Sequence, residues 1–260
     1  MEWSGAALLC ARNIEQEFLR QPTCVILAGG LGTRLRPVVH DRQKVMANVA
    51  GRPFLTYILD QLVHAGITRA VVCSGYLGDS LSNVLKDEYQ GLQLVYSHES
   101  TPLGTAGALK QAQPLVENFP VLVCNGDSYV DVDIDRFMAF HASRHSLMTL
   151  VLAKKQCSGA FGLVEVENGV VKRFSEKEST GRPEWVNAGM YLVEKQIIDS
   201  IPESRAVSLE REILPEWVGQ GIYGYAQPGE LVDIGTPSSW SEAQDVFGGR
   251  ALKPLIYSHS

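Results

Sequence analysis

Short apolar segments alternate with helical ones along the first half of the chain, and this alternation most constrains the fold. Strands are predicted at residues 24–28, 70–74, 92–97 and 121–124. Helices are predicted at residues 54–65, 80–89 and 105–112. Since short strands separated by helices form right-handed βαβ crossovers, the pattern predicts a parallel sheet that helices cover on both faces.

The second half of the chain instead alternates apolar and polar residues, as in strands that bury only one face. Strands are predicted at residues 148–153, 161–167, 170–174, 185–193 and 222–226. Asn168-Gly169 predicts a tight hairpin between two of them. We therefore predict an α/β fold, with a Rossmann-like, mostly parallel mixed sheet flanked by helices and a small antiparallel layer. Residues 23–250 are expected to form a single domain after an N-terminal extension over residues 1–22, with a helix over residues 4–19.

The composition excludes several classes of protein. Of 260 residues, 45% are hydrophobic and 20% are charged, which is typical of a globular enzyme and not of a disordered chain. The net charge of −6 argues against a broad nucleic-acid interface, and no apolar run approaches the ~18 residues of a membrane span. The five cysteines never form C-x-x-C, so we expect free thiols, a cytoplasmic compartment, and Cys24 and Cys124 as core residues.

A glycine-rich segment follows the first predicted strand, at residues 27–37. Its glycines let the backbone approach an anion closely, and successive N–H groups can form a nest for phosphate oxygens. It is not a Walker A loop, because no Gly-Lys-Ser/Thr follows, and Leu35 replaces the third glycine of the dinucleotide fingerprint. Such a segment can also be a plain turn, but Arg34 and Arg36 add positive charge and favour a polyphosphate ligand.

A carboxylate stands where a buried strand is predicted to end, at Asp127. In open α/β sheets, ligands gather at the carboxyl ends of the strands. Three more aspartates follow within residues 131–135, but a calcium loop is excluded because Arg136 and Ala142 replace the glycine and the glutamate that it requires. We expect these three aspartates in a loop and at the start of a helix.

These motifs, in this order, resemble those of the sugar-1-phosphate nucleotidyltransferases. Residues 29–37 match the family's GGxGTRLxP loop. Lys44 stands at the place of the family's lysine, with Gln43 and Val45 in place of the usual flanking prolines. Residues 102–108 resemble the loop that closes on the nucleobase. Further matches lie at residues 125–128, 161–162, 176–177, 186–191 and 231–237, so the resemblance covers roughly residues 23–246.

The resemblance implies a fold of the nucleotide-diphospho-sugar transferase type, with residues 23–147 mainly binding nucleotide and residues 148–246 mainly binding sugar phosphate. The nucleotide would contact Leu27, Ala28, Gly29, Gly30, Gly32, Thr33, Arg34, Pro102, Gly104 and Thr105. The sugar phosphate would contact Gly126, Gly162, Glu176, Lys177 and Asn187. Asp127 and Asp233 would bind Mg²⁺. The residues expected to carry catalysis are Arg34, Lys44 and Asp127.

The implied reaction converts an NTP and a sugar 1-phosphate into an NDP-sugar and pyrophosphate. Arg34 would hold the β- and γ-phosphates, Lys44 the α-phosphate and Lys177 the sugar phosphate. Residues 125–128, 207–215 and 233–240 are most similar to guanylyltransferases that act on D-glycero-D-manno-heptose 1-phosphate, so GTP and that sugar are the expected substrates. Neither a nucleic acid nor a membrane is expected as a partner, and homo-oligomerisation is left open.

Three alternatives stay open. One is a uridylyl-, thymidylyl- or mannose-1-phosphate guanylyltransferase of the same family. Another is a catalytically silent sugar-nucleotide sensor, which would have lost charged phosphate or metal residues. All of these residues are present: Arg34, Lys44, Asp127, Lys177 and Asp233. The third is a dinucleotide-dependent oxidoreductase, which the absent third glycine disfavours. Apart from the resemblance, Thr105 is expected to cap a helix.

Overall fold

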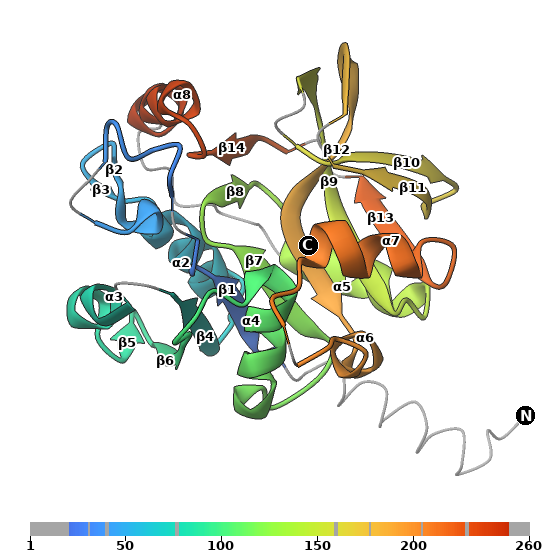
Figure 1. The fold of residues 1–260 in the computed structure, drawn as a ribbon, viewed down its shortest axis with the longest axis horizontal. Helices are drawn as coiled ribbons and strands as arrows, with labels where there is room; N and C mark the ends of the chain where they lie inside the picture. The colour runs from blue at the N-terminus through green and yellow to red at the C-terminus, as the bar shows by residue number, and fades with distance from the viewer. Residues whose placement is uncertain are drawn as a thin grey trace, which may run out of the picture.

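The computed structural model describes residues 21–30, 32–39, 42–75, 78–158, 161–176, 178–203, 205–226 and 229–249. At its centre is a sheet of 10 strands in the order β10-β11-β13-β9-β12-β7-β1-β4-β6-β5 (Figure 1). The helix predicted over residues 4–19 lies outside the described residues.

The parallel part of the sheet is built around β1 (Cys24–Leu27), which pairs with β4 (Arg69–Ser74) on one side and with β7 (Val121–Asn125) on the other. β6 (Leu92–His98) follows β4 in the sheet. The connecting helices are α2 (Leu55–His64), α3 (Gly78–Leu85) and α4 (Gly104–Ala112). The predicted βαβ pattern is confirmed, but the helix predicted over residues 80–89 is wrong at its end. There β5 (Glu88–Tyr89) pairs antiparallel with β6, because Gln90 and Gly91 have positive φ and reverse the chain.

The strands of the second half join the same sheet. β12 (Ser179–Val193) runs antiparallel to both β7 and β9 (Met148–Ser158), and β13 (Ile222–Ala226) runs parallel to β9. β10 (Leu163–Glu167) and β11 (Val170–Ser175) form the predicted hairpin, in which Asn168 and Gly169 have φ of 51° and 81°. The predicted mixed sheet is confirmed, and its antiparallel part continues the parallel part edge to edge.

Short elements surround the main sheet. Two small sheets pair β8 (Ser128–Val130) with β14 (Leu231–Asp233), and β2 (Asn48–Val49) with β3 (Arg52–Pro53). The remaining helical elements are η1 (Lys44–Met46), η2 (Gln113–Leu115), α5 (Ile134–Ser143), α6 (Lys195–Asp199), η3 (Leu209–Ile213), α7 (Leu214–Trp217) and α8 (Pro237–Gly249). Asp133 caps α5 by accepting the Arg136 N–H at 3.0 Å, so the expected helix start is confirmed. Among the described helices, none is long and apolar enough to cross a bilayer.

Apolar side chains cover both faces of the sheet, because alternate residues of each strand point to opposite sides. On one face Ile26 of β1 belongs to the same buried cluster as Leu59 of α2. On the other face Val25 belongs to a cluster with Leu109 of α4 and with residues of α6 and α7. The cysteines of β1 and β7 are buried free thiols, as predicted.

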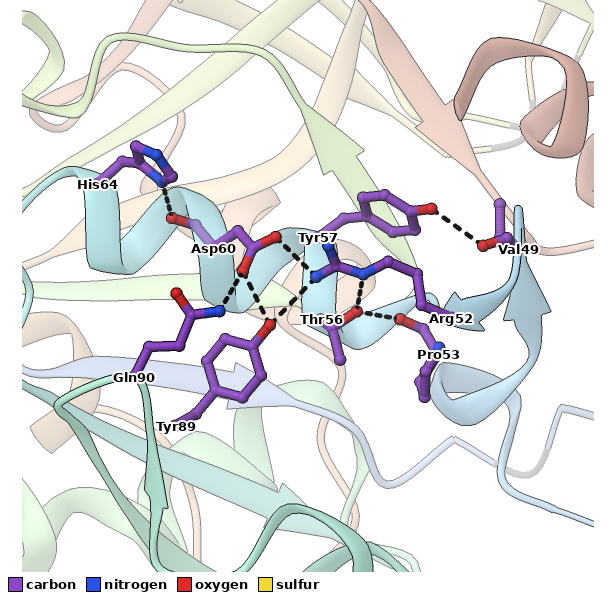
Figure 2. A network of polar contacts seen from close by, with 9 residues as sticks. All are labelled: Val49, Arg52, Pro53, Thr56, Tyr57, Asp60, His64, Tyr89 and Gln90. Atoms are coloured by element: carbon purple, nitrogen blue, oxygen red, sulfur yellow. Dashed lines mark hydrogen bonds and ion pairs between the residues drawn. The ribbon is translucent and has the colours of Figure 1, made fainter. Parts of the chain in front are cut away.

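A polar network ties α2 to β3 and β5 (Figure 2). Arg52 donates to Asp60 Oδ2 at 2.6 Å and to Tyr89 Oη at 3.1 Å, and Tyr89 donates to Asp60 Oδ1 at 2.8 Å. The guanidinium carbon also lies 4.5 Å from the centre of the Tyr57 ring. That ring stacks on Phe247 of α8 with 3.9 Å between centroids, so Arg52 supports the packing of the last described helix as well.

Arg52→Ala should lower the free energy of unfolding by about 1–3 kcal/mol, because it leaves the Asp60 carboxylate without its cation and uncovers the Tyr57 ring. Urea denaturation at neutral pH measures the loss. Arg173→Ala is the matched control, since Arg173 pairs with Glu165 and Glu178 on the exposed surface and such pairs contribute about 0–1 kcal/mol. Equal losses in the two variants would contradict the prediction.

Candidate active site

The strand order reverses at β1, because the chain runs from β1 through β4 to β6 on one side and returns to β7 on the other. Such a reversal leaves a crevice at the carboxyl ends of the two strands that flank it. A cavity of about 260 Å³ lies there. The predicted site residues that line it are Leu27, Ala28, Gly29, Gly30, Lys44, Pro102, Gly104, Thr105 and Asp127.

The loop after β1 follows the cavity wall, and its glycines allow close approach. A Cβ on Gly29 would overlap the Glu99 carboxylate. Gly32 has φ of 59°, in the left-handed region, and a Cβ there would lie 3.0 Å from Lys44 Cβ. A Cβ on Gly30 would meet nothing within 4 Å, so the backbone borders open space at this point. The loop therefore has the room that a phosphate contact requires.

A lysine and two aspartates meet beside this loop. Lys44 Nζ donates to Asp127 Oδ2 at 2.5 Å, and only 12% of the lysine side chain is exposed. The pairing of β14 with β8 sets Asp233 opposite Ser128, the residue after Asp127. A Cβ on Gly235 would lie 2.7 Å from Asp233 Oδ2 and 3.6 Å from Lys44 Nζ. The three charged groups therefore share one corner of the site.

The turn η1 holds Lys44 in place through its neighbours. Val45 and Met46 are buried, and the Met46 N–H donates to the Gln43 carbonyl at 2.9 Å. Gln43 has φ of −62°, the value that a proline would impose. The chain therefore adopts a proline-compatible turn although neither flanking residue of Lys44 is proline.

Glu99 also lines the cavity, and the sequence reasoning missed it. It follows β6, and its Oε2 accepts the Leu103 N–H at 3.0 Å. Burial raises the pKa of the Glu99 carboxyl above its ordinary value, and the Leu103 N–H opposes this rise. The signal that could have found it is the one used for Asp127, an acid just after a predicted strand.

Thr33 and Arg34 lie on the turn that follows the glycine loop, and both are exposed. Neither lines the cavity. Leu35 anchors this turn, because its side chain is buried and its N–H donates to the Gly32 carbonyl at 3.0 Å. The roles expected for Thr33 and Arg34 stay predictions.

Among the residues predicted for the sugar phosphate, the four that the structure describes lie outside the cavity lining. The Gly126 N–H donates to the Leu27 carbonyl at 2.9 Å, and Gly162 packs against the Phe174 ring. These two glycines thus allow close packing whatever else they contact. Lys177 lies outside the described residues.

The two remaining sugar-side residues are held by side chains of later elements. Glu176 accepts from Arg211 Nε at 2.7 Å, in an exposed ion pair. Asn187 is buried, and its Nδ2 donates to Tyr191 Oη at 2.7 Å. Their roles in binding sugar phosphate stay predictions.

The expectation that Thr105 caps a helix is wrong. α4 begins at Gly104 and Leu103 is its N-cap residue. Thr105 lies inside the first turn, where its hydroxyl donates to Glu210 Oε2 at 2.7 Å and accepts the Leu209 N–H at 2.8 Å. The Thr105 side chain therefore joins α4 to η3 instead of capping the helix.

The sequence matches the Nucleotidyl transferase family model over residues 23–247. It is 35% identical over 245 residues to a mannose-1-phosphate guanylyltransferase of Mycobacterium tuberculosis, covering 92% of this chain and 68% of that protein. It is 33% identical over 223 residues to the D-glycero-alpha-D-manno-heptose 1-phosphate guanylyltransferase of Aneurinibacillus thermoaerophilus, covering 85% and 96%. The chain spans 60–68% of the length of the first mannose-1-phosphate guanylyltransferases that it matches.

The fold is similar to that of the crystal structure of HddC from Yersinia pseudotuberculosis, with a TM-score of 0.79 and 29% identity over 87% of this chain and 100% of that one. The same protein complexed with GMP-PN gives a TM-score of 0.76 and 28% identity with the same coverage. The chain belongs to the nucleotidyl transferase family. The Mycobacterium and Aneurinibacillus relatives are both named as sugar-1-phosphate guanylyltransferases, a class within the family that the resemblance implied.

Glu99→Gln should raise the melting temperature at neutral pH. A carboxyl whose pKa is raised by folding lowers stability as pH increases from its unfolded pKa, about 4.3, through its higher folded pKa. Thermal unfolding measured from about pH 4 to pH 8 should therefore show a growing advantage of the variant over wild type. Glu216→Gln, at an exposed position on α7, is the matched control and should show no such trend. An advantage that shrinks with rising pH would contradict the prediction.

Proposed function

We propose that the protein is a sugar-1-phosphate guanylyltransferase, which transfers GMP from GTP to a sugar 1-phosphate and releases pyrophosphate. One observation carries the proposal: a single cavity at the switch point is lined by the glycine loop, the Lys44–Asp127 pair and a further carboxylate, Glu99. The relatives named as guanylyltransferases support the choice of nucleotide.

The chemistry asks the protein for positioning and for neutralisation of charge. An oxygen of the sugar phosphate attacks the α-phosphorus in line, and the bond from that phosphorus to pyrophosphate breaks. The N–H groups of the loop after β1 are proposed to hold the β- and γ-phosphates, with Arg34 reaching them from its exposed turn. Lys44 is proposed to leave Asp127 and donate to the α-phosphate. Lys177 is proposed to meet the acceptor phosphate.

Asp127 and Asp233 are proposed to hold Mg²⁺. Proteins commonly bind this ion through one or two carboxylates together with substrate phosphates. That mode suits this site, because Asp127 and Asp233 supply two carboxylates at one corner of the cavity, beside the glycine loop. Lys44 and the two aspartates leave a net negative charge, which a divalent cation would reverse before a triphosphate binds. When bound, the ion would stabilise charge on the reacting phosphates.

Glu99 is proposed to select guanine. Guanine presents two adjacent donors on one edge, N1–H and the N2 amino group, and an ionised carboxylate can accept both. Uracil and thymine present a single N–H between two carbonyls, which repel a carboxylate. Adenine and cytosine carry an acceptor at the corresponding ring nitrogen. A wrong base therefore cannot supply both donors to the Glu99 carboxylate, and such incomplete pairing of a buried polar group is what makes polar sites discriminate strongly.

The acceptor is proposed to be a sugar 1-phosphate of the manno configuration. D-glycero-D-manno-heptose 1-phosphate is the first candidate, because the chain spans 96% of the Aneurinibacillus relative named for that sugar. Mannose 1-phosphate is the second candidate, supported by 35% identity to the Mycobacterium relative. Residues 148–246 are proposed to supply most of this part of the site.

We also infer that the protein works in a reducing, cytoplasmic compartment. The Cys24 and Cys124 sulfurs lie 3.8 Å apart on neighbouring strands and both stay free thiols. The cysteines of the sequence support this proposal, because they are odd in number and never form C-x-x-C.

A screen for pyrophosphate release tests the proposal. GTP, ATP, CTP, UTP and dTTP are each mixed with mannose 1-phosphate, glucose 1-phosphate and D-glycero-D-manno-heptose 1-phosphate in the presence of Mg²⁺. We expect kcat/KM for GTP to exceed the values for UTP and dTTP by at least about a hundredfold. Glu99→Gln should remove most of this preference, because its amide group cannot accept both guanine donors.

Two outcomes of the screen would contradict different parts of the proposal. A preference for a pyrimidine triphosphate would overturn the guanylyl assignment. No turnover with any pair, in a protein that melts cooperatively, would overturn transferase activity and favour the silent sugar-nucleotide sensor.

Asp127→Asn and Asp233→Asn should each raise the Mg²⁺ concentration needed for half-maximal activity by about tenfold or more, since each removes a charged oxygen ligand. Titration of activity with Mg²⁺ at saturating GTP measures the change. Asp131→Asn is the control, because Asp131 lies just beyond β8 and outside the cavity lining. An Asp233→Asn variant with the wild-type Mg²⁺ requirement would show that the second ligand lies elsewhere.

A further inference from the structure

A bulge in β12 lies against the cavity wall. Along β12, Asn187 is opposite Leu152 of β9 and Tyr191 is opposite Leu150, so extra residues of β12 arch out of the pairing between these points. Gly189 lies in the arch with φ of 77°, and a Cβ there would lie 2.8 Å from Asn125 Nδ2. Asn125 in turn lines the cavity. Bulges of this kind re-aim side chains beside binding sites, so their position matters to the site.

A chain of hydrogen bonds joins this bulge to Thr105 in the lining of the cavity. Asn187 Oδ1 accepts the Gly189 N–H at 3.1 Å, and Asn187 Nδ2 donates to Tyr191 Oη at 2.7 Å. Tyr191 donates to Glu210 Oε1 at 3.3 Å. Thr105, which lines the cavity, donates to Glu210 Oε2 at 2.7 Å. Every donor in the chain is matched to an acceptor, so its direction is fixed.

The phenol is suited to its place in this chain. Tyr191 is fully buried, and burial, followed by the nearby Glu210 carboxylate, raises the pKa of its hydroxyl well above the ordinary value. The hydroxyl therefore stays protonated and donates to Glu210 at every physiological pH.

Glu210 is itself fastened to the start of α4 by the backbone. The Val207 N–H donates to the Leu103 carbonyl at 2.8 Å, and the Val207 carbonyl accepts the Ala106 N–H at 3.0 Å. The Leu209 N–H donates to Thr105 Oγ1 at 2.8 Å. These contacts fix the Glu210 carboxylate relative to the cavity-lining residues at the start of α4. Through Tyr191, the carboxylate in turn fixes β12 relative to the same residues.

We propose that Glu210 and Tyr191 are positioning residues that hold the β12 bulge in register with the nucleotide side of the cavity. The inference rests on the proposed function, because it assigns the bulge to the part of the site that receives the sugar 1-phosphate. Neither residue needs to touch a substrate. Their effect on the reaction passes through Asn187 and the Gly189 backbone, which lose their support when the chain is cut.

Tyr191→Phe tests the inference, because it removes the one hydroxyl that joins Asn187 to Glu210 and keeps the buried ring. We expect KM for the sugar 1-phosphate to rise by about tenfold or more, the effect of one lost hydrogen bond, with KM for GTP unchanged within about twofold. Tyr57→Phe is the matched control. It also removes a buried hydroxyl, one that donates to the Val49 carbonyl at 3.0 Å, and it should change neither KM.

Glu210→Gln disrupts the same chain of hydrogen bonds at a second point and keeps the size of the side chain. Since both substitutions break one path, the double variant should raise the sugar 1-phosphate KM no further than the more severe single variant. Thermal unfolding of all four variants checks that each is folded under the assay conditions.

The possible failures are distinct. An active wild type whose Tyr191→Phe variant keeps the wild-type KM for sugar 1-phosphate overturns the inference and leaves the proposed function intact. Equal rises in KM for sugar and for GTP overturn it as well, because they indicate a general loss of structure. A wild type inactive with every pair of substrates overturns the proposed function, and the inference with it.

Discussion

The placement of β1 between β4 and β7 is the constraint on which the rest of the site depends. Its register sets Leu27 opposite Cys73 on one side and opposite Asn125 on the other, so three strands end at one edge of the sheet. The Gly126 N–H then donates to the Leu27 carbonyl at 2.9 Å, which turns the chain toward Asp127. Because the loops begin from fixed strand ends, Lys44 and Asp127, which are far apart in sequence, converge there.

Local pattern predicts most of the fold, because each predicted strand is an apolar run whose neighbours in the sequence determine its conformation. It fails where the outcome depends on distant partners. Glu88 and Tyr89 continue a helical pattern in the sequence. The turn at Gln90 nevertheless reverses the chain, so that these two residues pair antiparallel with β6. The parallel pairing of β13 with β9 has no signature in either segment, since its register brings Ile222 opposite Met148 only after the sheet has formed.

The candidate site divides in the same way. The glycine loop, Lys44 and Asp127 belong to continuous motifs, and the structure brings them to one cavity. Glu99 belongs to no recognisable sequence motif. Its place in the cavity becomes visible only in the structure, where its carboxylate lies against Gly29. Glu176, which the resemblance selects, forms an exposed ion pair with Arg211, and its role in binding sugar phosphate stays a prediction. Contacts between segments decide these cases, and a single sequence does not contain them.

The start of α4 does not offer its N–H groups to a phosphate in this cavity. The first N–H groups of a helix often bind phosphate, because they lack partners within the helix. Here the Val207 carbonyl accepts the N–H groups of Ala106 and Gly107, at 3.0 and 3.3 Å. These two N–H groups are therefore already paired within the protein and are not free to bind an anion. In the proposed function, the loop after β1 and Lys44 meet the phosphate charge, and the wall formed by Glu99 and α4 remains for a ligand group that donates hydrogen bonds. A nucleotide with hydrogen-bond donors on its base and negative charge on its phosphates suits both of these features of the cavity.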